Sequence, residues 1–68
     1  MKKSKVTEYM IDYLIRKHIV PEEAARQTGI AVDKLRENYT EPLDAAEFLT
    51  LCSFLKIKPE TVARAVKD

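Results

Sequence analysis

The sequence has 68 residues, including one glycine and one cysteine, and a net charge of +1. A chain of this length forms one domain that buries only about 60% of its unfolded surface, which excludes a deep active-site cleft and favours helices with local contacts. Charged residues are too interspersed for a membrane span, and Glu8, Asp12 and Arg16 break the apolar region that follows the basic residues 1–5, so we expect no signal peptide either. The single cysteine, Cys52, excludes an intramolecular disulfide and is typical of a cytoplasmic protein.

Positive charge is concentrated at the start of the chain. Residues 1–20 contain five lysines and arginines against two acids, whereas residues 21–40 and 41–68 each carry a net charge of −1. We interpret residues 1–5 as a basic, flexible arm of the single domain 1–68, on which any affinity for nucleic acid would largely depend. A solubilising tail is the alternative interpretation.

Apolar spacing and capping residues predict five helices, of which the first covers residues 6–17. Val6, Met10 and Leu14 recur every four residues, and Ser4 can cap the helix that they define.

Two short helices are predicted next, around a glycine. Pro21 has the fixed dihedral of a first helical position, and Gly29 supplies the left-handed conformation that ends a helix, so this helix covers residues 21–28. The following helix is predicted over residues 32–38, with Asp33 near its N-terminus.

The last two helices have clear starts. Asp44 with Glu47 three residues later forms a capping box for a helix over residues 45–55, and Pro59 begins a final helix over residues 59–66. The expected apolar face of the helix 45–55 consists of Ala45, Phe48, Leu49, Cys52 and Leu55, widened by Leu51.

The run EEAARQTGIAVDKL resembles the helix-turn-helix of the lambda-repressor and Cro-like (Xre-type) family. Its Ala25, Gly29, Ile30 and Leu35 match the family's small residue, turn glycine and two core hydrophobes, and the later run DAAEFLTLCSFLKIKPE is similar to the helix that follows in many bacterial members. The resemblance covers residues 6–66. It implies a compact, all-α, five-helix domain that regulates transcription, in which the second helix touches the DNA backbone and the third enters the major groove.

The resemblance also implies which residues contact DNA. Arg36 matches a position that can bond guanine, Val32 one that can lie against a thymine methyl, and Asp33 and Glu37 positions that can accept from a cytosine amino group. The residues expected at phosphates are Lys2, Lys3, Lys5, Arg26 and Lys34.

Departures from the family pattern favour a second interpretation. Pro21 stands where the family commonly has a phosphate-bonding glutamine, and Ala31 stands where it commonly has a capping serine or threonine. The carboxylates of Asp33 and Glu37 would also repel a DNA backbone. The alternative is therefore a protein-interaction module that retains the helix-turn-helix scaffold without reading DNA.

Catalysis, cofactors and metal ions are not expected. A single glycine cannot form a glycine-rich phosphate loop, and one histidine with one cysteine gives no metal-ligand spacing. The expected partner is double-stranded DNA. A homodimer is left open, with Ala63, Val66, Leu51 and Tyr39 as candidate contacts.

Overall fold

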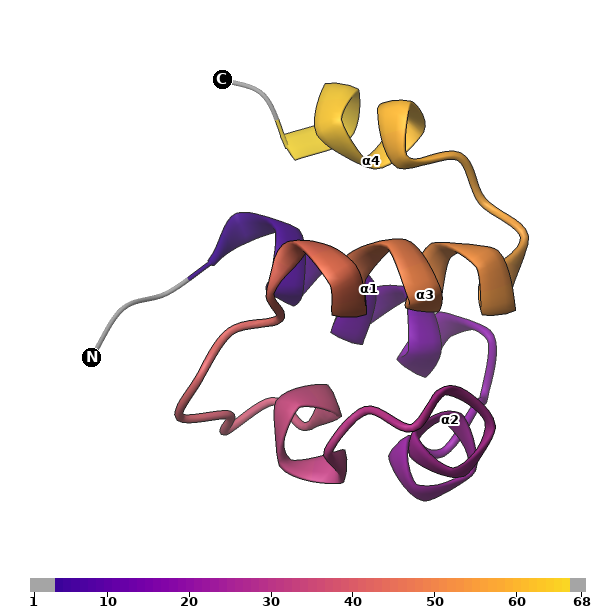
Figure 1. Cartoon of the computed structure of the whole chain (residues 1–68). Helices are drawn as coiled ribbons and strands as arrows, with labels where there is room; N and C mark the ends of the chain where they lie inside the picture. The colour runs from indigo at the N-terminus through magenta and orange to yellow at the C-terminus, as the bar shows by residue number, and fades with distance from the viewer. Residues whose placement is uncertain (1–3, 67–68) are drawn as a thin grey trace.

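The computed structural model describes residues 4–66, which form four α-helices and one short 3₁₀ helix. The α-helices are α1 (Lys5–Arg16), α2 (Pro21–Thr28), α3 (Ala45–Leu55) and α4 (Pro59–Val66), and the 3₁₀ helix η1 (Val32–Leu35) lies between α2 and α3. Figure 1 shows α4 on one side of α1 and α3, and α2 with η1 on the other side. None of the helices within residues 4–66 has the length and apolar character that crossing a membrane requires. The prediction of a compact all-α domain is confirmed.

The helix starts follow the capping residues of the sequence. The Ser4 hydroxyl accepts a hydrogen bond of 3.1 Å from the Thr7 N–H, so α1 begins at Lys5, one residue earlier than predicted. At α3, Asp44 accepts from the Glu47 N–H at 2.8 Å, and the Glu47 carboxylate accepts from the Asp44 N–H at 2.9 Å, which is a complete capping box. Because Ser4 and Lys5 belong to the start of α1, the expected flexible arm 1–5 is wrong at these two positions. Residues 1–3 lie outside the described part of the chain.

The third helix is much shorter than the predicted span 32–38. It is a 3₁₀ turn of four residues that ends at Leu35, and Arg36 is extended with φ −106° and ψ 153°. Ala31, at the N-cap position, makes no side-chain hydrogen bond to an amide of η1, so the turn lacks the cap that would stabilise a longer helix. The predicted third α-helix is therefore absent, and residues 4–66 contain four α-helices and a single 3₁₀ turn in its place.

Contacts with the start of α1 hold the segment that follows η1. The Ser4 N–H donates to the Tyr39 hydroxyl at 2.9 Å, and the Leu43 N–H donates to the hydroxyl of the buried Thr7 at 3.0 Å. Tyr39 itself is buried. These long-range contacts draw the chain away from a helical path after Leu35, which is the second reason why the third helix ends early.

The core lies between all four helices and η1. Its fully buried side chains are Met10, Leu14, Ala24, Ile30, Leu35, Leu51, Cys52 and Val62. The predicted inner face of α3 is wrong in part, because Leu49 is 53% exposed and Ala45 is exposed, whereas Leu51 is fully buried. The side of α3 that faces the core is centred on Leu51 and Cys52. The helix is therefore rotated about its axis relative to the prediction, and Leu49 is exposed to solvent. Because Leu51 and Tyr39 are buried within the monomer, they are not available as contacts of a homodimer.

Candidate nucleic-acid interface

The α2–η1 unit, residues 21–38, is built around a glycine turn. Gly29 has a φ of +79°, and its N–H donates to the Ala25 carbonyl at 2.8 Å, which ends α2 without the steric cost that a Cβ would bring. Ile30, before η1, and Leu35, its last residue, then insert into the core. Ala24 is the fully buried alanine of α2, while Ala25 is half-buried against the core. The turn therefore fixes η1 against α2, although η1 is one turn long.

The residues expected at base edges do not share one helical face. Val32 and Asp33 lie on η1, where Val32 is half-buried and Asp33 is exposed. Arg36 lies beyond the helix in extended backbone, and Glu37 lies in the turn closed by the hydrogen bond from the Tyr39 N–H to the Arg36 carbonyl, 3.1 Å long. The predicted helix 32–38 would have carried all four residues, but it ends at Leu35, so Arg36 and Glu37 lie beyond it.

The cations of the α2–η1 unit are all paired with carboxylates. Arg36 donates to Glu22 at 2.7 Å, and this pair is exposed to solvent. Lys34 donates to both oxygens of Glu47, at 2.8 and 3.1 Å, and both side chains of this pair are about four-fifths covered. Arg26 pairs with Glu23 within α2, on the surface.

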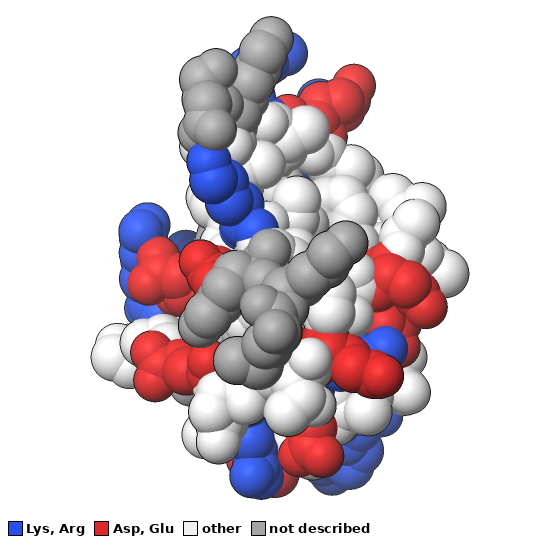
Figure 2. All heavy atoms as spheres, turned by 90° about the vertical axis from the view of Figure 1, so that its left-hand side faces the viewer, with Lys and Arg blue, Asp and Glu red and all other residues white. Residues whose placement is uncertain are grey.

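The remaining expected phosphate contacts lie on or before α1. Lys5 is exposed at the first residue of α1 and takes part in an interaction of its own. Lys2 and Lys3 fall outside the described residues. Figure 2 shows the side of the molecule where α1 and α3 begin, and acidic and basic side chains are interspersed over it. This side does not present a uniformly positive field.

Hydrogen bonds lower the pKa of Glu22 and raise the pKa of Lys34. The pKa of Glu22 is held below its ordinary value of 4.5, first by a backbone hydrogen bond at its own amide and then by the Arg36 guanidinium. The hydrogen bond from Lys34 to Glu47 raises the pKa of Lys34 above 10.5. Both shifts favour the charged form, of the Glu22 carboxylate and of the Lys34 ammonium group respectively.

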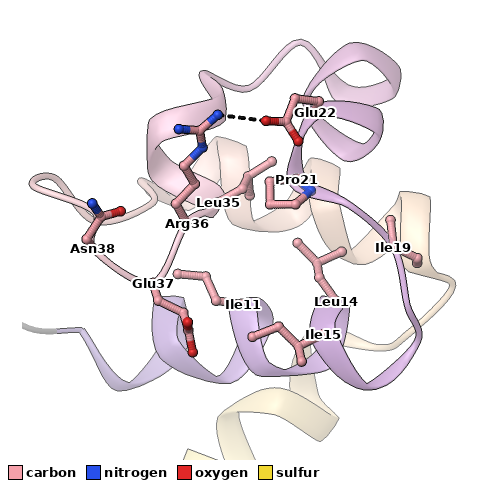
Figure 3. Close-up of a pocket in the computed structure, with 10 residues that line it drawn as sticks. All are labelled: Ile11, Leu14, Ile15, Ile19, Pro21, Glu22, Leu35, Arg36, Glu37 and Asn38. Carbon is pink, nitrogen blue, oxygen red and sulfur yellow. Dashed lines mark hydrogen bonds and ion pairs between the residues drawn. The ribbon is translucent and has the colours of Figure 1, made fainter.

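A hollow of about 450 Å³ lies between α1 and the segment 35–38 (Figure 3). Its walls are the aliphatic side chains Ile11, Leu14, Ile15, Ile19 and Leu35 with the ring of Pro21. The Arg36–Glu22 pair spans one part of its rim, and Glu37 and Asn38 line another. Sequence reasoning missed this hollow because it forms where the chain leaves the helical path at Arg36. The sequence signal for it is Ile11, an apolar residue next to Met10 on the first helix.

No protein-family model, curated protein or solved structure matches this chain. Within residues 4–66 there is no group of three or more potential metal ligands.

Proposed function

We propose that this chain is a small DNA-binding transcriptional regulator of the lambda-repressor and Cro-like type, which contacts the major groove through the α2–η1 unit. One observation carries the proposal: Gly29 joins α2 to η1 in the left-handed conformation, with Ile30 and Leu35 buried behind the turn. In this proposal the turn positions η1 as the second element of a helix-turn-helix, the element that enters the major groove. The order of α1, α2, η1, α3 and α4 also follows the order implied by the family resemblance.

The short η1 changes how the groove would be read. Val32 and Asp33 would reach base edges from η1 itself. Val32 would contact a thymine methyl group, and Asp33 would accept a hydrogen bond from a cytosine amino group. Arg36 and Glu37 would approach from the backbone beyond η1, with Arg36 on guanine. The phosphate contacts of the proposal are Lys2, Lys3, Lys5, Arg26 and Lys34.

Internal carboxylates would compete with DNA for these cations. Exposed ion pairs contribute about 0–1 kcal/mol, so the Arg36–Glu22 pair can give way to a guanine or a phosphate at small cost. The Lys34–Glu47 pair is largely covered and includes the capping carboxylate of α3, so Lys34 would contribute least. Glu22 is thus the carboxylate that limits DNA binding in this proposal.

An NMR titration with a mixed-sequence DNA duplex tests the proposal. At physiological salt we expect a dissociation constant of about 10⁻⁴ to 10⁻⁶ M, with amide shifts at residues 32–37 that are larger at about 50 mM salt and fade as the salt concentration rises. Glu22→Gln should strengthen binding by about tenfold at low salt, because it removes a negative charge and releases Arg36.

The matched control is Glu60→Gln. Glu22 and Glu60 each follow a proline that begins an eight-residue helix, but Glu60 lies on α4, away from the α2–η1 unit. If the two variants strengthen binding equally, the effect is one of net charge alone, and the role given to Glu22 and Arg36 is rejected. Unmoved amide signals at low salt would reject DNA binding itself.

The hollow beside Arg36 favours a protein-interaction module as the second candidate. Its aliphatic lining and the 51% exposure of Ile15 suit a leucine or isoleucine side chain from a partner protein. N-acetylleucine amide, used at millimolar concentration as a stand-in for such a side chain, should shift the methyl signals of Ile15 and Leu35 independently of salt. Methyl signals that move no more than that of Val20, which is exposed outside the hollow, would remove this candidate.

A further inference from the structure

A second hollow, of about 270 Å³, lies where α1 and α3 end. Figure 1 shows both helices ending on the same side of the molecule, at the right. Lys17 and Lys56, each the residue that follows its helix, line the hollow and are exposed. We call it the lysine hollow. Its remaining walls are four half-buried apolar side chains from α1, the turn after it and α3, namely Tyr13, Ile19, Phe54 and Leu55.

The lysine hollow is positively charged and has no neutralising carboxylate. None of the described residues that line it is acidic, and neither Lys17 nor Lys56 forms an ion pair within residues 4–66. The Lys17 ammonium group instead lies 5.6 Å from the centre of the Tyr13 ring. The hollow beside Arg36, in contrast, has Glu22 and Glu37 among its lining residues. Carboxylates pair with the other cations for which the structure gives ion pairs, which are Arg16, Arg26, Lys34 and Arg36.

The helix ends reduce this positive charge but do not cancel it. Lys17 caps the C-terminus of α1 and Lys56 caps that of α3. The C-terminal end of a helix carries a partial charge of about −0.5. Two ammonium groups beside two such ends therefore leave an excess of about one positive charge. An anion with a single negative charge would neutralise that excess.

We propose that the lysine hollow binds a small aromatic monocarboxylate, whose carboxylate group contacts Lys17 and Lys56 while its ring packs against the apolar walls. Aromatic rings pack favourably against one another, and two of the walls are the rings of Tyr13 and Phe54. The volume is slightly below the roughly 300–1,000 Å³ of sites for drug-sized ligands, so it suits a single ring with a short side chain.

This site goes beyond the proposed contact with DNA and does not depend on it. None of the residues that line the lysine hollow belongs to the α2–η1 unit. Because both lysines are exposed to solvent, their attraction for a carboxylate is screened, and the binding should be weak. For 3-phenylpropionate we expect a dissociation constant on the order of 1 mM.

An NMR titration of the full chain with 3-phenylpropionate, up to about 20 mM at neutral pH, tests the proposal. The methyl signals of Leu55 should shift and saturate. Those of Leu35, which lines the other hollow, and of the exposed Leu49 should not. The amide 3-phenylpropionamide has nearly the same shape without the charge, so it should bind about tenfold more weakly. Unmoved Leu55 signals, or equal affinities for the acid and the amide, overturn the proposal.

Substitutions of the lysines test which charges hold the carboxylate. Lys17→Gln and Lys56→Gln should each raise the dissociation constant about three- to fivefold, because each removes one of the two ammonium groups. A loss in only one of the two variants would contradict a site built from both lysines. If circular dichroism shows that Lys56→Gln does not fold, Lys56→Gly takes its place, because glycine readily adopts the φ of +60° at this position.

The matched control is Lys58→Gln. Lys58 is also exposed and has no ion pair within residues 4–66, and it lies two residues from Lys56 without lining the hollow. The control therefore makes the same change in net charge. It should leave the dissociation constant within about twofold of the wild-type value. An equal loss in all three variants would show an effect of net charge alone and overturns the proposal.

Discussion

The α2–η1 unit and α3 expose their surfaces in opposite ways. In the α2–η1 unit, Arg26, Lys34 and Arg36 are each paired with a carboxylate, and the segment is held to the core chiefly by Ile30 and Leu35. The helix α3 contributes two fully buried side chains to the core, and no charge occurs on its outer face, which consists of the exposed residues Ala45, Ala46, Leu49, Thr50 and Ser53. The difference shows that the α2–η1 unit exposes paired charges, whereas α3 exposes small and aliphatic side chains without charge.

The largest expected effect separates a leucine of η1 from a leucine of the outer face of α3. Leu35 is 1% exposed, so Leu35→Ala should reduce the free energy of unfolding by about 3 kcal/mol through lost burial and a cavity. Leu49→Ala should cost less than about 0.5 kcal/mol, because Leu49 is 53% exposed. Urea denaturation at a few micromolar measures both. Similar costs for the two variants would show that η1 is not anchored as described.

The second largest expected effect is a difference in the rate of thiol labelling between the buried and the exposed side of α3. Cys52 is fully buried, and this burial raises the pKa of its thiol, so a thiol reagent at pH 8 should label it only after local opening. In a Cys52→Ala background, the exposed position of Ser53→Cys should be labelled at least about 100-fold faster. Labelling of both at comparable rates would contradict the assignment of the inner and outer sides.

Substitutions at the residues that end α2 and α3 should change the stability by smaller amounts and in opposite directions. Gly29 has a φ of +79° with open space around it, so Gly29→Ala should cost about 1–2 kcal/mol from backbone strain alone. Lys56 ends α3 with a φ of +60°, and Lys56→Gly should stabilise the protein by about 0.5 kcal/mol after the entropy of glycine in the unfolded state is included. Thermal unfolding measures whether each variant is destabilised or stabilised. A stabilising Gly29→Ala variant would show that the turn is not left-handed.

The smallest expected effect concerns the exposed pair of the α2–η1 unit. Because the pKa of Glu22 is lowered on folding, its stabilising contribution is present above its ordinary value of 4.5 and is lost as the pH falls through the lower, folded value. A carboxyl NMR titration should place its midpoint below 4.5. In Arg36→Gln the midpoint should rise but stay below 4.5, because the backbone hydrogen bond is the larger cause. A midpoint unchanged by Arg36→Gln would show that the pair does not form in solution.

Helix starts could be predicted from the sequence because their causes are local. Ser4, Asp44 and the two prolines act on amides within three or four residues, so α2, α3 and α4 have their predicted bounds and α1 differs by one residue at each end. The candidate site was predictable in part for the same reason. Gly29 and the apolar residues around it were found from the sequence, and they build the turn that positions η1.

The errors arose where distant residues decide the conformation. The length of the third helix depends on Tyr39 and Leu43 contacting the start of α1, 35 and 36 residues away in the sequence. The partner of Arg36 depends on how α2 lies beside the segment after η1. The exposure of Leu49 depends on which side of α3 meets the other helices, because an apolar pattern on both sides does not specify the buried one.

The sequence by itself determined that the chain is all-α and where the four α-helices begin and end, because capping residues, prolines and one glycine act within a turn of the backbone. Only the tertiary structure decided that the third helix is a single turn and that the cations of the α2–η1 unit are neutralised by carboxylates. It also decided that an uncharged face of α3 remains in solvent. Apart from the Arg26–Glu23 pair within α2, each of these features depends on contacts between elements that are far apart in the chain, which local spacing does not encode.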